Sequence, residues 1–331
     1  MRVMEIHEFG DPEVLRLGDR PVPKPDPGEV LVRIVAASVN PIDTKLRRNG
    51  PPIAPELPGV LGCDFAGTIE ALGADVTEFA IGDQVYGSPG GVRGTCGSYA
   101  EYATADARSL APKPESLGMR HAAAIPLVAI TAWEGLVIRA QVQPGMKVLI
   151  HGGAGGVGHA AIQIAKAHGA HVTTTVSSDV KAAIVRDLGA DEVVFYRDEA
   201  VTDYVQRLTN GEGFDIVFDT TGGSDLPTSF QAARLNGQVV TIVAQYEADL
   251  TQMHLRGLTL HVVFMIIPVL YNRGRSVHGE ILRNISGLVA QGRYRPLLDP
   301  NEYRLEQVAE AHERLESGES RGKLVLDVES R

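Results

Sequence analysis

Six consecutive residues in the middle of the chain have the spacing with the most specific chemistry. They are Gly153, Ala154, Gly155, Gly156, Val157 and Gly158, with glycine at the first, third and sixth places of the motif. An apolar segment, 147–151, precedes them and an alanine-rich segment follows, so the expected order is strand, glycine turn, helix. Such glycines let the backbone approach a pyrophosphate, and the helix N-terminus attracts its charge. The motif therefore predicts dinucleotide binding.

The end of the second expected strand indicates which dinucleotide binds. NAD sites of this type usually have an acidic side chain there, about 20 residues after the glycine motif, which bonds the ribose 2′-hydroxyl. This chain has Ser177 and Ser178 at that point, followed by Lys181. Two hydroxyl groups and a cation accommodate a 2′-phosphate without charge repulsion, so we expect NADPH rather than NADH. Alternatively, the serines cap the next helix and Lys181 is a surface cation.

The elements that must position these residues indicate an α/β protein. Six expected strands alternate with helices, which predicts a doubly wound, six-stranded parallel Rossmann sheet with right-handed crossovers. The expected strands are 147–151, 171–176, 192–196, 214–219, 238–243 and 258–264. The expected helices outside the glycine motif include 128–140, 226–235, 277–291 and 305–315.

The two ends of the chain have a different pattern. Residues up to about 120 resemble short strands between glycine and proline clusters, with no helix of convincing length apart from a possible turn at 42–48. The last expected strand, 323–328, has no crossover partner nearby, so we expect it to return to the first domain. The predicted organisation is a dinucleotide domain, 123–265, inserted into a β-rich domain of residues 1–122 and 266–331. A substrate cleft would lie between the two.

Composition narrows the class of protein. The chain has 331 residues, 44% hydrophobic and 22% charged, as in ordinary soluble proteins. Its net charge of −10 argues against nucleic acid or an anionic membrane as a partner. Two cysteines, Cys63 and Cys96, provide no disulfide framework, so we expect a reducing, cytoplasmic location. We expect no secretory leader, and the longest apolar stretch, 262–270, is too short to span a bilayer.

A family resemblance extends these expectations. The segment 145–166 closely resembles the signature of quinone oxidoreductases, which belong to the medium-chain dehydrogenase/reductase superfamily. The segments 39–43 and 58–67 resemble N-terminal motifs of the superfamily. The resemblance covers nearly the whole chain and implies a GroES-like β-rich domain around the Rossmann domain, with NADPH as cofactor. It also implies a homodimer through the edge strand 258–264, unless helix 277–291 covers that edge.

The same resemblance bears on metal binding. Zinc enzymes of the superfamily place a cysteine and a histidine in the two N-terminal segments, where this chain has Asn40 and Cys63. The third ligand position falls near Pro126 or Leu127, which cannot bind a metal. We therefore expect no metal. Cys63 beside Asp64 could hold a stray ion, but we favour a buried structural thiol.

Without a Lewis acid, the substrate must already be electrophilic. Quinones and α,β-unsaturated carbonyl compounds meet this condition and accept hydride from NADPH. We expect Asn40 to hydrogen-bond the nicotinamide side or the substrate carbonyl, unless it merely caps the turn before Pro41. The tyrosine that the family often has after Asp43 is absent. Lys45 and Tyr86 are candidates to approach the oxyanion. Alternatively, Lys45 is a solvated cation, Tyr86 is a tyrosine of the core, and water is the proton donor.

Further cofactor contacts are expected at strand ends and from the resemblance. The resemblance places Thr131 near the cofactor and Tyr196 beside the 2′-phosphate. Other candidates follow the carboxyl ends of strands, where ligands approach open sheets, or come from the returning tail. They are Thr221, Gly222, Val243, Phe264 and Lys323. Each has a plain alternative as a packing or turn residue.

Three functions remain open. The leading hypothesis is an NADPH-dependent, zinc-independent reductase of quinones or activated alkenes. The second is an enoyl-thioester reductase of the same superfamily, in which Arg47, Arg48 and Arg93 would meet a coenzyme A phosphate. The third is an NADPH-binding protein without turnover, as among crystallin relatives of the family.

Overall fold

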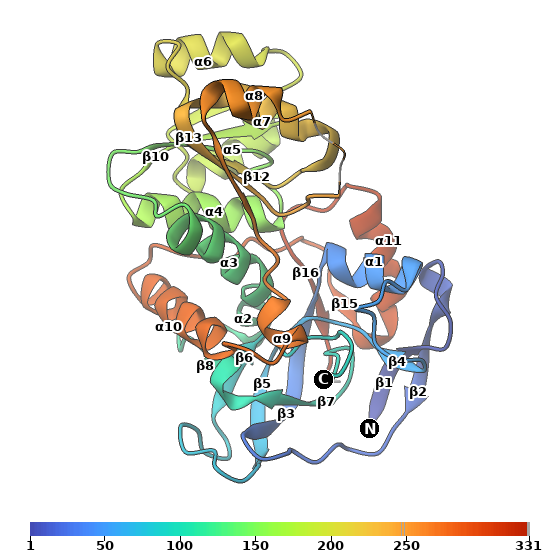
Figure 1. Cartoon of the computed structure of the whole chain (residues 1–331). Coiled ribbons are helices and arrows are strands. Elements are labelled where there is room, and N and C mark those ends of the chain that lie inside the picture. Colours follow the sequence, from blue (N-terminus) through green and yellow to red (C-terminus); the bar gives the residue numbers. More distant parts are fainter. Residues whose placement is uncertain (246, 248, 330–331) are drawn as a thin grey trace. The chain divides into compact units, whose positions relative to one another are not determined.

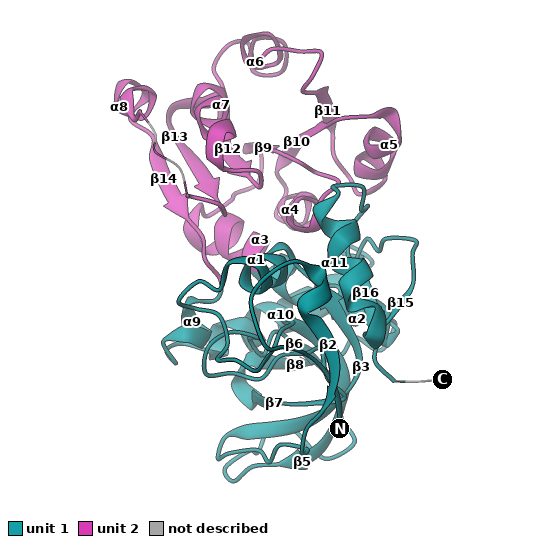
Figure 2. Ribbon diagram, turned by 90° about the vertical axis from the view of Figure 1, so that its right-hand side faces the viewer, with its two compact units in different colours: residues 1–130, 266–331 teal, residues 131–265 magenta. Residues whose placement is uncertain are grey.

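The computed structural model describes residues 1–245, 247 and 249–329, which form two compact units (Figure 2). Unit 1 contains residues 1–130 and the segment from 266 onward, and unit 2 contains residues 131–265. The chain leaves unit 1 once and returns to it once, so unit 2 is an insertion in sequence. The expected division lay at 122/123 and 265/266, and the structure has it at 130/131 and 265/266.

Unit 2 contains a six-stranded sheet in which every pair of neighbouring strands is parallel. Its strands are β9 (Lys147–Ile150), β10 (His171–Val176), β11 (Glu192–Phe195), β12 (Phe214–Asp219), β13 (Ala233–Thr241) and β14 (Thr259–Val262). Their order is β11-β10-β9-β12-β13-β14. The chain runs outward from β9 to β11, then continues on the other side of β9. This confirms the predicted doubly wound sheet, with β14 at one edge.

Helices connect these strands, as Figure 1 shows. They are α4 (Gly156–Ala167), α5 (Asp179–Asp187), α6 (Val201–Thr209), α7 (Leu226–Ala232) with the 3₁₀ turn η4 (Gly223–Asp225) before it, and α8 (Thr251–Arg256). Helix α3 (Pro126–Trp133) and the π-helical segment η3 (Glu134–Arg139) lead into β9. Val148, Leu149 and Ile150 of β9 are fully buried, as expected for a central strand covered on both faces.

Two predicted helices of unit 2 need correction. The predicted helix 226–235 ends at Ala232, because the chain is already extended at Ala233, the first residue of β13. Asn236 has φ of 56° inside β13, where the pairing with β12 is irregular. The predicted helix 128–140 becomes π-helical in its second half, with Ala140 N–H bonded to Gly135 O at 2.9 Å.

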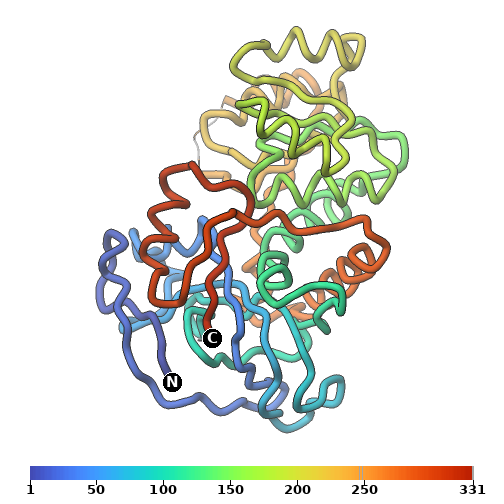
Figure 3. The backbone as a smooth tube through the Cα atoms, turned by 180° about the vertical axis from the view of Figure 1, so that it is seen from behind, coloured from blue at the N-terminus to red at the C-terminus, as the bar shows by residue number. Residues whose placement is uncertain are grey.

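Unit 1 is built on two sheets. A seven-stranded sheet has the order β15-β16-β3-β5-β6-β8, with β7 also paired to β3, and a three-stranded sheet has the order β2-β1-β4. The strands are β1 (Arg2–Ile6), β2 (Leu15–Asp19), β3 (Glu29–Val39), β4 (Gly59–Val60), β5 (Asp64–Leu72), β6 (Gln84–Gly87), β7 (Tyr102–Asp106), β8 (Leu110–Pro112), β15 (Tyr303–Arg304) and β16 (Leu324–Asp327). As expected, the C-terminal strand returns to this unit. β16 pairs antiparallel with β3, and Figure 3 shows the red tail beside the blue N-terminal segment.

Short helices complete unit 1. They are α1 (Pro41–Asn49), α2 (Met119–Ala123), α9 (Ile267–Leu270), α10 (Ser276–Ala290) and α11 (Val308–Glu316), with 3₁₀ turns η1 (Pro12–Val14), η2 (Ala107–Ser109) and η5 (Leu305–Gln307). The possible turn predicted at 42–48 is a helix of nine residues, α1, so the expectation of no helix of convincing length in this region needs correction. Pro41 favours its first position, and Gly50 ends it in a left-handed conformation with φ of 52°. In the described part of the chain, every helix is too short or too polar to cross a bilayer.

Candidate functional site

The first half of the glycine loop packs against the end of β10. The N–H of Gly152 donates to Thr175 Oγ1 at 3.0 Å, and that of Gly153 donates to the Thr175 carbonyl at 3.3 Å. A Cβ atom at Gly153 would lie 2.1 Å from Thr174 Oγ1, far inside contact distance. Only glycine therefore allows this close approach of the loop to β10.

The second half of the loop forms the N-terminus of α4. Gly155 is exposed and stands at the N-cap, and the first bond of the helix joins His159 N–H to Gly155 O at 3.1 Å. The N–H groups of the three residues between them precede that bond and have no acceptor in the helix. These residues are Gly156, Val157 and Gly158. Helix α4 has 12 residues, so its dipole adds positive potential at the same place. The loop, including the small Ala154, fits a pyrophosphate.

The predicted 2′-phosphate residues gather at the carboxyl ends of β10 and β11. Val176 pairs with Phe195, so Ser177 and Tyr196 follow neighbouring residues of the two strands. Ser178 caps α5, its Oγ accepting the backbone N–H of Lys181 at 3.4 Å. The capping alternative is therefore realised for Ser178.

An additional cation stands at the same corner. Tyr196 is 52% exposed, and the guanidinium carbon of Arg197 lies 5.6 Å from the centre of its ring. Arg197 is not among the predicted site residues, although its position directly after Tyr196 in the sequence is a usable signal. The corner thus offers the hydroxyl groups of Ser177 and Ser178, between β10 and α5, and two cationic side chains, those of Lys181 and Arg197.

The turn after β12 uses its polar groups internally. Asp219 Oδ1 accepts the N–H and the hydroxyl of Thr221 at 2.9 and 2.8 Å, and the N–H of Gly222 at 2.8 Å. Gly222 has φ of 63°, and a Cβ atom there would lie 2.2 Å from Val243 O. The bonds of Thr221 therefore match its alternative role as a turn residue. Gly222 and Val243, two of the cofactor candidates, lie next to each other.

The remaining candidates of unit 2 belong to other segments. Phe264 follows β14 and is 38% exposed, and Thr131 lies buried in α3. Sequence reasoning missed a pair on adjacent strands, His151 after β9 and Asp219 at the end of β12. His151 Nε2 and Asp219 Oδ2 are buried with no hydrogen-bond partner among the described residues. Burial lowers the pKa of His151, although the charge of Asp219 opposes this.

In unit 1, Asn40 is at the centre of a buried polar cluster. Its Nδ2 donates to Asp64 Oδ2 at 3.0 Å, and its Oδ1 accepts from Lys323 Nζ. Lys323 also donates to Val39 O at 3.1 Å and is 3% exposed. The expectation that Lys323 approaches the cofactor needs correction, because these bonds and burial hold its ammonium group inside unit 1.

Asp64 is the anionic partner of this cluster. Its Oδ2 accepts the hydroxyl of Ser38 at 2.9 Å as well as Asn40 Nδ2, and its Oδ1 accepts the N–H of Leu127 at 2.9 Å. Lys323 Nζ lies 3.6 Å from Oδ2. Burial raises the pKa of Asp64 and lowers that of Lys323, and each charge opposes the shift of the other.

Asp43 connects Asn40 to a second hydrogen-bonded chain. Its Oδ2 accepts the backbone N–H of Asn40 at 2.8 Å and the hydroxyl of Tyr99 at 3.1 Å. Burial raises the pKa of Asp43 to about 6, although the nearby Cys63 thiol and the Asn40 N–H favour the charged form. Tyr99 OH lies 3.0 Å from His312 Nε2, and His312 Nδ1 lies 3.1 Å from Arg47 Nη1.

The direction of this chain follows from Arg47, which can only donate. His312 Nδ1 must therefore accept, so in the neutral ring Nε2 carries the proton and donates to Tyr99. Burial and, to a smaller extent, the charge of Arg47 lower the pKa of His312 to about 3, so the ring is neutral near pH 7. Because Arg47 does not release a proton, the chain orients Asp43 and does not conduct protons from solvent.

Several predicted roles are not supported in unit 1. The Tyr86 hydroxyl donates to Leu282 O at 2.6 Å and contacts Ser286 Oγ at 2.9 Å, which favours the packing alternative over catalysis. Lys45 is exposed on α1, as in its solvated alternative. Arg47 is fully buried, with its guanidinium bonded to Glu316 at 2.9 Å, so it cannot join a coenzyme A patch.

The donor set for a metal is poor. Cys63 is fully buried, and its thiol donates to Gly90 O at 3.0 Å. Burial raises the pKa of Cys63, and the charges of Asp43 and Asp64 raise it further, whereas zinc binds the thiolate. Among residues 1–245, 247 and 249–329, no three His, Cys, Asp or Glu side chains are grouped to hold a metal ion.

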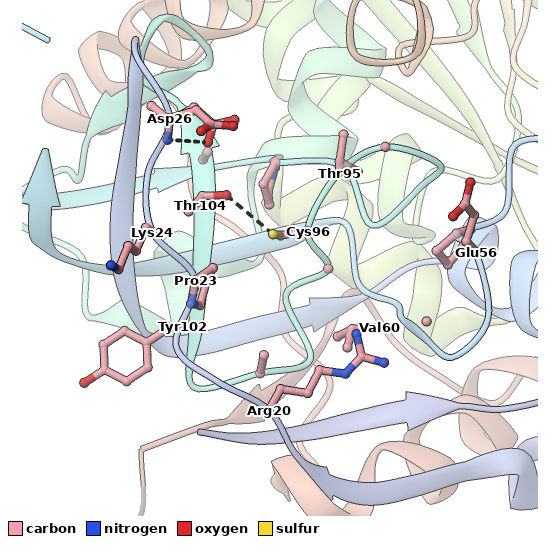
Figure 4. A pocket seen from close by; sticks show the side chains of 18 of the residues that line it. Arg20, Pro23, Lys24, Asp26, Glu56, Val60, Thr95, Cys96, Tyr102 and Thr104 are labelled. Carbon is pink, nitrogen blue, oxygen red and sulfur yellow. Dashed lines mark hydrogen bonds between the residues drawn. The ribbon is translucent and has the colours of Figure 1, made fainter. Parts of the chain in front are cut away.

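A pocket of about 610 Å³ lies elsewhere in unit 1 (Figure 4). Its lining includes Arg20, Lys24, Glu56 and Cys96, and the Cys96 thiol is 3.4 Å from Thr104 Oγ1. Its lining also includes Arg93, one of the three arginines of the enoyl-thioester reductase hypothesis, but none of the predicted catalytic or cofactor-binding residues. The pocket is therefore separate from the Asn40 cluster.

Comparisons with known proteins agree with these features. A family model described as alcohol dehydrogenase GroES-like domain matches residues 26–115, and one described as zinc-binding dehydrogenase matches residues 188–326. The chain is 32% identical to a quinone oxidoreductase from Homo sapiens over 329 residues, covering 98% of this chain and 97% of that protein.

Solved structures show the same similarity. An alcohol dehydrogenase superfamily protein from Novosphingobium aromaticivorans has a TM-score of 0.94 and 41% identity, covering 99% of this chain and 100% of that one. The Escherichia coli quinone oxidoreductase complexed with NADPH has a TM-score of 0.87 and 28% identity, with 99% and 100% coverage.

Proposed function

Because the chain belongs to the quinone oxidoreductase family of the medium-chain dehydrogenase/reductases, we propose that it reduces quinones or α,β-unsaturated carbonyl compounds with NADPH and without zinc. The observation that carries the proposal is the glycine loop at the start of α4. It presents three backbone N–H groups and has no space for a side chain at Gly153 or Gly158. Bound NADPH would supply the hydride.

The chain's own residues would bind and orient this cofactor. The loop N–H groups receive the pyrophosphate, and Ser177, Ser178, Lys181 and Tyr196 receive the adenosine 2′-phosphate, with Arg197 as a further cation. The corner has no acidic side chain at the end of β10 itself, and Asp179, in the first turn of α5, is the nearest carboxylate in sequence. This arrangement favours NADPH over NADH.

Zinc independence rests on the donor set at Asn40 and Cys63. An amide that already holds Asp64 and Lys323, beside a protonated buried thiol, does not supply the three ligands of a catalytic zinc site. The substrate must therefore be activated by its own conjugation. Asn40 has a second N–H, whose contact with Ser38 O is long at 3.5 Å, and this group hydrogen-bonds the nicotinamide side or the substrate carbonyl. The proton that completes the reduction comes from water.

We also propose a homodimer through β14. This strand is the edge of the sheet in unit 2, and Val262 on it is 50% exposed. Helix α10, the alternative cover for this edge, contacts β6, β8 and η2 of unit 1. A monomer by light scattering at micromolar concentration would contradict the dimer. The two free cysteines fit a reducing compartment, and we propose the cytoplasm.

Two assays test the proposed function. Fluorescence titration measures NADPH binding, and absorbance of the reduced nicotinamide measures its oxidation by 1,4-benzoquinone, an alkenone and crotonyl-coenzyme A. Turnover with the first two acceptors supports the proposal. Turnover with crotonyl-coenzyme A alone supports an enoyl-thioester reductase. Binding without turnover supports a non-catalytic NADPH-binding protein. About one zinc per purified chain would contradict zinc independence.

A further inference from the structure

The Asn40 carboxamide lies between two buried charges of opposite sign. Its Nδ2 donates to Asp64 Oδ2 at 3.0 Å, and its Oδ1 accepts from Lys323 Nζ. All three residues belong to unit 1 and are 0–3% exposed. The carboxylate and the ammonium therefore act on the amide with little solvent screening.

Strand register brings the three residues together. Asn40 directly follows β3, Asp64 begins β5, and Lys323 directly precedes β16. β3 is antiparallel to both other strands, with Ser38 opposite Asp64 and Val39 opposite Leu324. The sheet itself, rather than a mobile loop, thus fixes the positions of both charges relative to Asn40.

These charges determine which way the amide faces. If the carboxamide turned by 180°, its N–H groups would face the ammonium of Lys323 and its oxygen would face the carboxylate of Asp64. Both contacts would become repulsive in a region of low dielectric constant. The assignment of Oδ1 and Nδ2 of Asn40 is therefore set by chemistry.

Lys323 has little capacity for any other role. Its ammonium group donates to Val39 O at 3.1 Å and to Asn40 Oδ1, and it forms an ion pair with the Asp64 carboxylate at 3.6 Å. Burying a lysine is costly unless it is paired and hydrogen-bonded, and these contacts meet that requirement. The side chain is thus suited to hold Asn40.

We infer that Lys323 and Asp64 are positioning residues that hold Asn40 so that it offers a bound molecule an N–H donor and no acceptor. The second proton on Nδ2 is the group offered: it is hydrogen-bonded to Ser38 O at the long distance of 3.5 Å, and a carbonyl oxygen of the bound molecule would replace this weak bond. The site would then select a carbonyl oxygen, on the substrate or on the nicotinamide amide. This inference rests on the proposed function, in which Asn40 makes that contact.

A double-mutant cycle distinguishes positioning from a general structural role. Lys323→Met removes the ammonium and should lower kcat/KM for quinone by about tenfold or more. In an Asn40→Ala background, the same change should alter kcat/KM by less than about twofold, because the positioned group is already absent. An equal loss in both backgrounds would overturn the inference. NADPH affinity, measured by fluorescence, should change by less than about threefold.

Matched controls accompany the cycle. Lys113→Met removes another partly buried lysine of unit 1, whose Nζ bonds the carbonyls of Pro114 and Leu117, and it should leave kcat/KM unchanged. If Lys323→Met does not fold because Asp64 loses its counter-charge, the pair Lys323→Met with Asp64→Asn restores charge balance. This pair of changes should also lower kcat/KM when Asn40 is present, and it should not lower kcat/KM further in the Asn40→Ala variant.

A measurement without turnover separates this inference from the proposed function. In protein labelled with ¹⁵N-asparagine, the Asn40 side-chain signal is assigned from its absence in Asn40→Ala. The NH₂ group should exchange with water at least about tenfold faster in Lys323→Met than in the native chain. Unchanged exchange would overturn the positioning role. If the native protein had no activity but the NH₂ group still exchanged faster in Lys323→Met than in the native chain, only the proposed reaction would be refuted.

Discussion

A Cβ atom at Gly158 would lie 2.2 Å from the carbonyl oxygen of Gly152, so helix α4 and the glycine loop are in direct backbone contact. Gly158→Ala must therefore move the helix start away from the loop. We expect a loss of about 1–3 kcal/mol in the free energy of unfolding, as for other overpacked sites. NADPH affinity should fall by about tenfold or more, since the loop N–H groups move with the helix. Urea unfolding and fluorescence titration measure the two effects.

Gly287 provides the control for that substitution. It lies inside α10, and a Cβ atom there would have no heavy atom within 4 Å apart from those of its chain neighbours and of the nearby backbone of α10. Gly287→Ala should leave NADPH affinity unchanged and stabilise the protein by up to about 1 kcal/mol. If both alanine variants had the same effect on affinity, the close approach at Gly158 would not be the cause.

Ser178→Asp tests the preference for NADPH. Aspartate caps helices as well as serine does, so α5 should keep its start. The new carboxylate would repel the 2′-phosphate and could bond a ribose 2′-hydroxyl. We expect NADPH affinity to fall about tenfold or more, while NADH affinity stays equal or improves. Parallel titrations with both cofactors measure this, and equal losses for both would contradict the assignment of the corner.

Local signals in the sequence were enough to predict much of unit 2. The glycine spacing after an apolar strand identified the loop, and alternating strands and helices identified the sheet. Helix α1 was predicted only as a possible turn at 42–48, although Pro41 and Gly50, at its two ends, are ordinary start and stop signals. Its short length and polar composition concealed it among the strands of unit 1.

The Asn40 cluster could not be predicted in the same way. Lys323 reaches Asn40 across 283 residues and Arg47 reaches His312 across 265, so neither contact leaves a local pattern. The sequence did indicate that Asn40 is important and that the tail returns to unit 1. Only the register of β16 on β3 shows that Lys323 bonds the Asn40 carboxamide.

Asp43 predicts a pH dependence of stability. Its pKa is raised by burial from 3.8 to about 6, so between these values the unfolded chain is ionised while the folded chain keeps the proton. The stabilising contribution is full below about pH 4 and is lost as pH rises through about 6. Because one unit of pKa corresponds to about 1.4 kcal/mol, the total contribution of Asp43 to the free energy of unfolding is on the order of 3 kcal/mol.

Asp43→Asn removes this titration while keeping an oxygen for the Asn40 N–H and the Tyr99 hydroxyl. The variant should gain stability relative to the native chain as pH rises from about 4.5 to 7. Urea unfolding of both proteins across this range measures the difference. A constant difference would mean that Asp43 does not change its protonation between these pH values.

Tyr86→Phe separates catalysis from packing at the tyrosine that was a candidate acid. Its hydroxyl donates to Leu282 O at 2.6 Å and contacts Ser286 Oγ at 2.9 Å, so both of its hydrogen-bonding roles are used. Burial also raises the pKa of Tyr86, which opposes proton release. We expect the variant to lose about 1 kcal/mol of stability, with kcat and its pH profile unchanged. Because Phe keeps the ring and removes only the hydroxyl, a tenfold fall in kcat with unaltered unfolding would restore Tyr86 as the proton donor.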